Sequence, residues 1–300
     1  MKIVFWGTPD FAVPSLKMLL ENNHQVKAVV TSPDKERGRG QRVSFTPVKD
    51  FALQNNIPIL QPEKLKSEEF NNALKKFDVD LYVVVAFKIL PREIFAIPRY
   101  GSFNLHASLL PKFRGAAPIQ WTLINGESET GVTTFSLEDK VDTGNIYLQK
   151  KIAILPEDNF GTLHDKLSLL GAEAVLETVS AIENGTFNMI KQSDELATPA
   201  PKVTKELIQI DWNKSAKEVH NLVRAFSPYP GAFFVHESKV IKIFQTRIDN
   251  SINLSRGEIL QKKEHLFFGC GEGTVEVIEI QYEGRKKMST SEFLRGYSFK

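Results

Sequence analysis

Cysteine is almost absent from this chain, which has a single one, Cys270, among its 300 residues. One thiol cannot form an intramolecular disulfide and cannot build a cysteine-ligated metal cluster. The 6 histidines also show no pair at a spacing that is typical of a metal site. We therefore expect no metal, a reducing compartment such as the cytoplasm, and a packing role for Cys270.

Long apolar runs are missing as well. No stretch reaches the roughly 18 consecutive apolar residues that predict a membrane-spanning helix. The apolar segment at residues 2–6 gives way to polar sequence at Asp10, which makes it too short for a secretory signal. We expect a chain that is neither exported nor inserted into a membrane.

An excess of charge of one sign is lacking too, since 38 Lys and Arg residues face 36 Asp and Glu residues and the formal net charge is +2. This balance does not by itself indicate nucleic-acid binding, so such a function depends on where the charges cluster. With 42% hydrophobic and 25% charged residues, the composition is that of a soluble globular chain with one large core or two modest ones.

The glycine-rich fingerprint of a dinucleotide site is also absent. Gly7 follows the first predicted strand, at a position where phosphates often bind. However, the turn Gly7-Thr8-Pro9-Asp10-Phe11 has one glycine where the fingerprint has three, and it contains a proline. A tight turn into a helix is the better interpretation, and we expect no nicotinamide cofactor.

What the first part of the chain does have is an alternation of apolar, strand-like segments with amphipathic helical segments. The strands are predicted at residues 2–6, 26–30, 57–60, 81–86, 102–105 and 131–135. The helices are predicted at residues 11–22, 47–54, 67–76 and 160–184, the last one ended by Gly185. Such alternation is typical of βαβ units around a mostly parallel sheet.

The pattern changes after residue 190. Residues 191–205 are polar and rich in proline, which indicates a linker. Residues 206–300 then contain one predicted helix at 215–225 and several short strands, at 232–235, 240–246, 257–260, 266–269 and 275–281. The expected fold class is α/β: a Rossmann-like, doubly wound, mostly parallel sheet in residues 1–190, and a second, smaller β-rich barrel (OB-like) domain in residues 206–300.

The residues that point to chemistry surround the predicted strand at 102–105. Side chains two apart on a strand share a face, so Asn104 and the adjacent His106 point the same way. Asp142 lies in the turn Val141-Asp142-Thr143-Gly144, which could bring a carboxylate to them. An amide donor, an imidazole and an acid are the groups needed to move an acyl group between nitrogens. The alternative is a purely structural histidine, which is common near strand ends.

A second unusual stretch, residues 33–49, carries five basic residues against two acidic ones. The basic residues are Lys35, Arg37, Arg39, Arg42 and Lys49. Most charge-rich loops of this kind are solvated and flexible. Because Arg39 lies between Gly38 and Gly40, this loop also suits a segment that becomes ordered on a phosphate backbone.

At this point the sequence resembles a known family. The segment 108–120, SLLPKFRGAAPIQ, is similar to the signature of folate-dependent formyltransferases. Further similar segments are Gly7–Phe11, Gly131–Thr133, Ala200–Val203 and Arg224–Gly231, so the likeness covers nearly the whole chain. Members of this family share the asparagine, histidine and aspartate, which here are Asn104, His106 and Asp142.

The resemblance implies that the formyl group of 10-formyltetrahydrofolate is transferred to an amine, with Asn104, His106 and Asp142 as the catalytic residues. The most similar members imply the α-amino group of methionine on initiator tRNA as the acceptor, in the service of translation initiation. They also imply a cytoplasmic enzyme. No protein partner is indicated, and we expect a monomer.

The resemblance also assigns residues to folate. These are Phe87, Ile89, Leu90, Ser108, Leu109, Leu110, Pro111 and Val141. The segment Ala86–Pro91 departs from the family pattern, since it lacks the usual glycine, is one residue shorter, and has Phe87 where a tyrosine is usual. Lys140 likewise stands where a glycine is common.

For tRNA, the resemblance makes the loop at residues 33–49 the part that wedges against the acceptor stem. Arg39 is the principal contact it implies, with Arg37 and Arg42 beside it. The C-terminal domain, residues 206–300, would follow the tRNA backbone. It has 14 Lys and Arg against 12 Asp and Glu, so any basic surface there requires clustering.

Three alternatives stay open. One is a formyltransferase that acts on an amino-sugar nucleotide or on glycinamide ribonucleotide, because both use the same three catalytic residues. Another is a formyltetrahydrofolate hydrolase, in which water replaces the amine, although it would not need a basic C-terminal module. The third is a non-catalytic RNA-binding protein, which the intact set Asn104, His106 and Asp142 disfavours.

Overall fold

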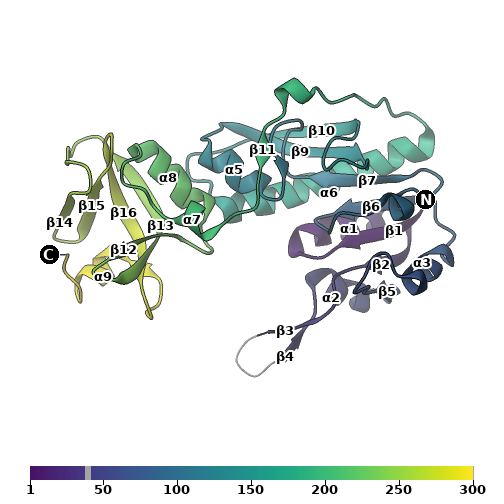
Figure 1. The fold of residues 1–300 in the computed structure, drawn as a ribbon, viewed down its shortest axis with the longest axis horizontal. Helices are drawn as coiled ribbons and strands as arrows, with labels where there is room; N and C mark the ends of the chain where they lie inside the picture. The colour runs from purple at the N-terminus through teal and green to yellow at the C-terminus, as the bar shows by residue number, and fades with distance from the viewer. Residues whose placement is uncertain (38–41, 300) are drawn as a thin grey trace. The chain divides into compact units, whose positions relative to one another are not determined.

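The computed structural model describes residues 1–37 and 42–299 (Figure 1). Contacts divide the chain into two compact units. The first unit consists of Met1–Gly115, Thr130–Ile152 and His164–Pro199, and the second of Ala116–Glu129, Ala153–Leu163 and Ala200–Lys300. The domains predicted from the sequence are continuous stretches of chain. The second unit, in contrast, includes two short segments that precede residue 190, Ala116–Glu129 and Ala153–Leu163. The predicted domain boundaries stay a prediction.

The first unit is built on a seven-stranded sheet with the strand order β10-β9-β7-β6-β1-β2-β5. The strands are β1 (Lys2–Gly7), β2 (Gln25–Val30), β5 (Ile59–Leu60), β6 (Leu81–Val85), β7 (Ser102–His106), β9 (Glu129–Ser136) and β10 (Ile146–Ala153). The pairs β1–β2, β1–β6, β2–β5 and β6–β7 are parallel, and β7–β9 is antiparallel. The prediction of a mostly parallel α/β sheet is confirmed.

The central strands β1 and β6 are mostly apolar because helices cover both faces of a sheet of this type. Ile3, Val4, Phe5 and Trp6 have no exposed surface, and every residue of β6 is buried. The strand that carries the predicted catalytic residues, β7, lies directly beside β6. It is therefore held by main-chain hydrogen bonds to a fully buried strand.

The helices of the first unit are η1 (Asp10–Ala12), α1 (Val13–Glu21), α2 (Pro47–Gln54), α3 (Glu68–Lys75), α4 (Arg92–Phe95), α6 (Phe160–Asn184) and η2 (Asp194–Leu196). Thr46 and Ser67 cap α2 and α3 with their side-chain oxygens. Helix α6 lies close against the sheet, because Thr178 bonds Thr134 of β9 at 2.7 Å. At Gly171 an added Cβ would come within 2.6 Å of Leu105 of β7.

The basic segment at residues 33–49 is more regular than a solvated loop. Strands β3 (Lys35–Arg37) and β4 (Arg42–Ser44) pair in antiparallel fashion, with Arg37 opposite Arg42 (Figure 1). The lack of apolar periodicity predicts a loop here, whereas the structure has two short strands that together form a β-ribbon. Backbone pairing of this kind needs no apolar pattern. The predicted tRNA contact Arg39 lies outside the described residues.

The second unit contains an antiparallel sheet with the order β12-β13-β16-β15-β14, to which β17 adds at β16. Its strands are β12 (Ala232–His236), β13 (Lys239–Asp249), β14 (Ile259–Lys262), β15 (His265–Gly269), β16 (Thr274–Tyr282) and β17 (Met288–Ser289). Its helices are α5 (Pro118–Ile124), α7 (Lys205–Ile208), α8 (Ala216–Ala225) and α9 (Thr290–Leu294). The β-rich second domain is confirmed, and its OB-like closure stays a prediction.

Aromatic packing fills the core of this second unit. Trp212 stacks on Phe268 with ring centroids 4.5 Å apart and planes 7° apart, and Phe234 meets both rings edge-on. Cys270 is buried in the same core, and burial raises the pKa of its thiol to about 11. The expected packing role of Cys270 agrees with this environment, since such a thiol is neither a thiolate nor exposed.

The predicted linker at residues 191–205 differs from an unstructured connection. Gln192 is buried, and the strand β11 (Pro199–Ala200) pairs with β8 (Arg114–Gly115). The hydroxyl of Thr198 accepts a hydrogen bond from the Phe113 amide at 2.8 Å. Side-chain and strand-edge hydrogen bonds hold this segment, and such bonds leave no periodic pattern in a sequence.

The connection between β9 and β10 depends on Gly144. A Cβ at this position would lie 1.7 Å from the Ser136 carbonyl oxygen, a main-chain atom that cannot move aside. We expect Gly144→Ala to lower the free energy of unfolding by about 1–3 kcal/mol, measured by urea denaturation.

Gly296→Ala is the matched control, because no atom lies within 4 Å of its added Cβ. That variant should stay within about 0.5 kcal/mol of the parent protein. Equal effects of the two substitutions would contradict the assigned close approach.

Candidate active site

Strand β7 presents two of the predicted catalytic residues on one face. Asn104 lies opposite Phe135 of β9, and His106 lies opposite Thr133. The Asn104 side chain is half-buried and makes no hydrogen bond to any residue that the structure describes. Its amide is therefore available to a substrate.

The orientation of the His106 ring is fixed by a main-chain oxygen. Its Nε2 lies 2.8 Å from the carbonyl oxygen of Phe113. Because a carbonyl only accepts, Nε2 must carry the hydrogen and donate it. In the neutral ring the other nitrogen, Nδ1, then holds a lone pair, and it is the atom that can take up a proton.

That free nitrogen faces Asp142. The distance from His106 Nδ1 to Asp142 Oδ2 is 3.8 Å, too long for a hydrogen bond but short for a charge interaction. Both side chains are less than a tenth exposed. The turn at Val141–Gly144 thus brings the carboxylate within range of a charge interaction with the imidazole. Orientation of the ring comes from Phe113 instead, because the carbonyl is the closer partner.

The carboxylate of Asp142 is itself held. Its Oδ2 accepts a hydrogen bond from the Gly115 amide at 2.8 Å. Asp142 also adopts φ of 56°, in the left-handed region that few residues other than glycine occupy. Ala86 and Phe113 have φ of 49° and 60°. Such backbone outliers cluster at functional sites when the surrounding structure holds them in place.

The residues predicted to contact folate fall into two classes. Ile89 and Val141 expose large apolar side chains, with 72% and 49% of their surface accessible. Leu90 and Leu110 are buried in the apolar core, and Phe87 packs against Trp6 with ring centroids 5.5 Å apart. Side chains of the first class can contact a ligand directly, while those of the second shape the backbone.

The segment that contains Ser108, Leu109, Leu110 and Pro111 is tied to the sheet. Thr133 of β9 donates its hydroxyl to the Ser108 carbonyl at 2.7 Å and accepts from the Leu110 amide at 3.1 Å. The Ser108 hydroxyl donates to the Lys112 carbonyl, so it is used within the loop. Leu109 and Pro111 are half-buried. The backbone of this segment is a fixed edge beside His106.

Several groups that shape the site leave no signal in the sequence. The Phe113 carbonyl and the Gly115 amide are main-chain atoms, which carry no residue-type signal. Gln192 and Arg114 were assigned to a linker and a family signature without a role. Arg37 and Arg42 lie opposite each other on the paired strands β3 and β4.

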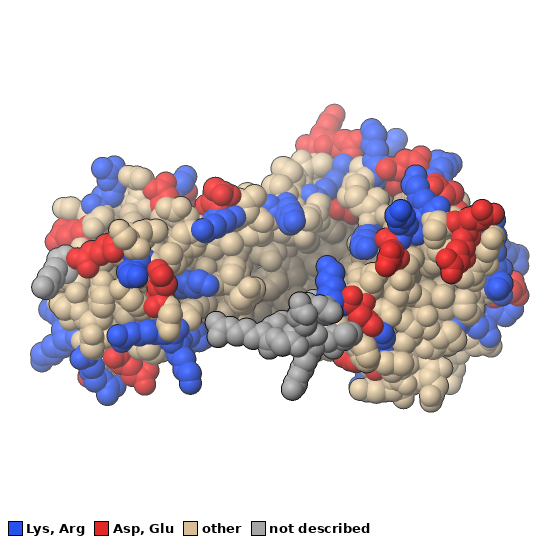
Figure 2. All heavy atoms as spheres, turned by 60° about the horizontal axis from the view of Figure 1, so that its bottom comes forward, with Lys and Arg blue, Asp and Glu red and all other residues tan. Residues whose placement is uncertain are grey.

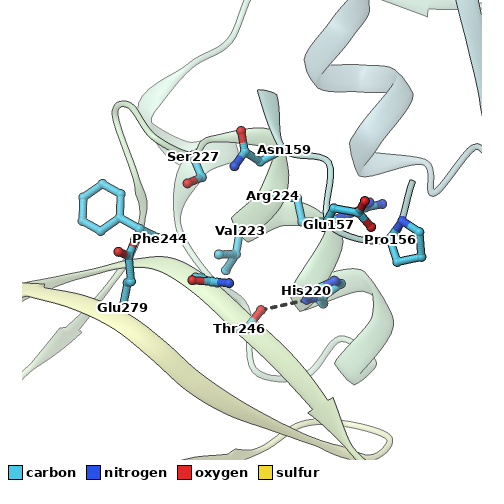
Figure 3. Close-up of a pocket in the computed structure, with 11 residues that line it drawn as sticks. Pro156, Glu157, Asn159, His220, Val223, Arg224, Ser227, Phe244, Thr246 and Glu279 are labelled. Atoms are coloured by element: carbon cyan, nitrogen blue, oxygen red, sulfur yellow. Dashed lines mark hydrogen bonds between the residues drawn. The ribbon is translucent and has the colours of Figure 1, made fainter. Parts of the chain in front are cut away.

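The second unit contains a pocket of about 210 Å³ (Figure 3). It lies among α8, the strand β13 and the segment before α6, and none of the predicted catalytic or folate residues lines it. Figure 3 shows His220 and Thr246 at one end and Asn159 and Ser227 at the other. This mixture of donors, acceptors and the apolar Val223 suits a small polar ligand or ordered water.

Two titratable groups of the pocket have altered pKa values. Burial, with the neighbouring Arg224 charge, lowers the pKa of His220 to about 4, so its ring is neutral at pH 7 and pairs with the Thr246 hydroxyl at 2.9 Å. Burial also lowers the pKa of Arg224, which Asp158 partly counteracts. The Arg224 guanidinium donates to Asn221 at 2.9 Å and more weakly to two carbonyls of the preceding segment.

Surface charge gives no single dominant patch in the view drawn. Figure 2 shows lysine and arginine side chains on that face mixed with aspartate and glutamate. Among the residues described, no group of three or more His, Cys, Asp or Glu side chains could hold a metal ion. Within the same residues, no helix is both long and apolar enough to cross a membrane.

Two family models match most of this chain. The family model described as formyl transferase matches residues 1–179, and that of the formyl transferase C-terminal domain matches residues 202–298. A methionyl-tRNA formyltransferase of Caldanaerobacter subterraneus is 48% identical over 301 residues, covering 99% of this chain and 97% of that protein. One of Bacteroides thetaiotaomicron is 45% identical over 308 residues, with coverage of 99% and 96%.

A solved structure also shares the fold. WlaRD, a sugar 3N-formyl transferase crystallised with dTDP and 5-N-formyl-THF, superposes with a TM-score of 0.71 at 21% identity. The superposition covers 95% of this chain and 99% of WlaRD. At that identity the likeness supports the architecture alone.

His220 predicts a pH dependence of stability. Its pKa is about 4 in the folded chain and 6.5 for the free side chain, so between these values the unfolded chain binds more protons. Stability from this group is complete above pH 6.5 and is lost as the pH falls toward 4. We expect His220→Gln to flatten the pH dependence of the unfolding free energy in that range, measured by urea denaturation.

The control is the same pair of proteins between pH 7 and 8, where both states hold His220 neutral and the two curves should run parallel. Parallel curves from pH 4 to 8 would show that His220 does not titrate in this way.

Proposed function

This chain belongs to the formyl transferase family, in the group of the methionyl-tRNA formyltransferases, and on that premise we propose that it formylates methionyl initiator tRNA. The donor is 10-formyltetrahydrofolate, and the acceptor is the α-amino group of the esterified methionine. The product serves translation initiation. The observation that carries this proposal is the His106 ring, whose free Nδ1 faces a buried carboxylate beside an unused Asn104 amide.

The reaction has a simple balance. A bond forms between the methionine nitrogen and the formyl carbon, the bond from that carbon to the folate N10 breaks, and one proton moves from the amine to N10. As the amine attacks, negative charge grows on the formyl oxygen, and the Asn104 amide is the donor that stabilises it. A preorganised donor of this kind is worth about 3 kcal/mol.

Proton transfer uses the remaining groups. His106 Nδ1 accepts the proton of the attacking amine, directly or through water, and can return it to N10. Asp142 stabilises the imidazolium that forms between these two events, as the 3.8 Å separation supports. Because the Phe113 carbonyl holds Nε2, the ring cannot turn away while Nδ1 exchanges its proton.

We assign folate to the edge formed by Ala86–Pro91 and Ser108–Pro111. The exposed Ile89 and Val141 provide apolar surface for the pterin and its linker, and both are unusually exposed for their type. Phe87, Leu90, Ser108, Leu109, Leu110 and Pro111 contribute mainly through their backbone.

Recognition of tRNA is assigned to residues around the β3–β4 ribbon and to the second unit. Arg39 is the principal proposed contact, with Arg37 and Arg42 on the flanking strands. Arginine pairs well with phosphate oxygens, and the affinity should fall as salt rises. We further propose that the protein works as a monomer in the cytoplasm.

The alternative acceptors receive less support. WlaRD shares the architecture and acts on a sugar, but it is only 21% identical to this chain. Two relatives at 45% and 48% identity, matched over 96% and 97% of their length, are methionyl-tRNA formyltransferases. Because these relatives are transferases, they give no support to the alternative of a formyltetrahydrofolate hydrolase.

Substrate choice is tested by incubating the purified protein with 10-formyltetrahydrofolate and several amines. We expect formylation of methionyl initiator tRNA and no product with free methionine, an amino-sugar nucleotide or glycinamide ribonucleotide. Product is measured by mass spectrometry of the amino acid released from tRNA. Formate release without transfer, or a formylated sugar, would overturn the proposal.

The role of Asn104 is tested by Asn104→Ala. Loss of the oxyanion donor should lower kcat by about 10²- to 10³-fold with little change in the KM for either substrate. Asn250→Ala, at an exposed position of the second unit, is the matched control and should behave as the parent protein. Turnover of Asn104→Ala close to that of the control would exclude this role.

A further inference from the structure

We propose that Gln192 and Arg114 are positioning residues that hold Asp142 in its working conformation. This inference deepens the proposed function and rests on it for its kinetic part. The side chain of Gln192 is only 8% exposed, although it lies in a polar segment that resembles a linker. A buried amide needs partners for its donors and its acceptor.

The side-chain amide of Gln192 donates two hydrogen bonds to the turn Val141–Gly144. Its Nε2 donates to the carbonyl oxygen of Asp142 at 3.0 Å and to that of Gly144 at 2.7 Å. Both hydrogens of the amide are therefore used on the same turn. One bond is made at the carbonyl of Asp142, whose φ of 56° is otherwise unfavourable, and the other lies two residues further on. Together they stabilise this conformation of the turn.

The acceptor of Gln192 is held by an arginine fork. Arg114 donates to Gln192 Oε1 from Nε at 3.1 Å and from Nη2 at 2.8 Å. Bonds from a guanidinium are stronger than neutral ones and fix which end of the amide faces the turn. The remaining Nη1 bonds the exposed Asp194 at 2.7 Å.

Arg114 is next in sequence to the residue that binds the Asp142 carboxylate. The Gly115 amide donates to Oδ2, while Arg114 acts through Gln192 on the Asp142 backbone. The short strand β8 thereby holds the carboxylate of Asp142 directly and its backbone through Gln192. It is anchored in turn by the bond from the Arg114 amide to the Thr198 carbonyl at 2.8 Å.

This arrangement explains how a carboxylate on a turn keeps a fixed distance to His106. A catalytic group displaced by about 1 Å can cost roughly 10²-fold in rate, so a turn without such support would be a poor position for an acid. The network therefore acts on Asp142 without touching the substrate.

Gln192→Met tests the proposal, because methionine has a similar length and lacks the two donors. We expect kcat to fall about 10- to 100-fold with KM nearly unchanged for folate and tRNA. Arg114→Lys keeps the charge but loses the fork, and we expect a smaller fall in kcat. Asp194→Asn is the matched control, since it alters only the exposed partner of the same arginine, and it should keep the parent rate.

A double-mutant cycle with Asp142→Asn separates positioning from general damage. If Gln192 acts through Asp142, Gln192→Met should cost less than about 2-fold in the Asp142→Asn background. The full single-mutant loss in that background would overturn the proposal.

A readout independent of catalysis is hydrogen exchange at the Gly115 amide, whose acceptor is the Asp142 carboxylate. Gln192→Met and Arg114→Lys should accelerate it, while Asp194→Asn should not. Unchanged exchange in Gln192→Met overturns the positioning role even if the parent protein fails to formylate tRNA. Faster exchange together with an inactive parent protein would uphold the positioning and refute the proposed function. If Gln192→Met does not fold, Arg114→Lys carries the same two measurements.

Discussion

The hydrogen bond from His106 Nε2 to the Phe113 carbonyl is the interaction on which the chemistry proposed for this site depends. It decides which ring nitrogen holds the lone pair, and so it decides that the proton-accepting atom is the one that faces Asp142. Phe113 can offer its carbonyl there because its own backbone lies in the left-handed region and its amide is bonded to Thr198. A strand, a strained loop and a distant polar segment thus combine to fix one tautomer.

Much of the fold follows from patterns that the sequence displays directly. The apolar strands β1 and β6 and the helix α6 lie close to their predicted ranges, because burial on both faces or along one stripe leaves a periodic signal. The strands β3 and β8 were not predicted as strands, since two- or three-residue pairings are stabilised by backbone bonds alone. The segment Ala116–Glu129 belongs to the second unit because of its tertiary contacts, and no local sequence pattern encodes such contacts.

Some residues of the candidate site could likewise be predicted from the sequence, and others could not. Asn104 and His106 could be placed on one face because side chains alternate along a strand, and a glycine-closed turn made Asp142 their natural partner. What could not be predicted is the role of groups without distinctive chemistry. Phe113 contributes a carbonyl, Gly115 an amide, and Gln192 is one polar residue among many in its segment. Their importance comes from position, and position is known only after the chain has folded.

The shared architecture of WlaRD bears on where acceptor specificity resides. A sugar formyltransferase superposes on this chain over nearly all of both molecules, so the fold itself does not select between a sugar amine and an aminoacyl-tRNA. Nor can the three proposed catalytic groups select, because stabilising an oxyanion and moving one proton are the same tasks for either amine. Specificity must therefore come from groups that contact the acceptor far from its reacting nitrogen. In this chain we propose the β3–β4 ribbon for that role, because Arg37 and Arg42 lie on it and the bonds that fix His106 and Asp142 come from the main chain of Phe113 and Gly115.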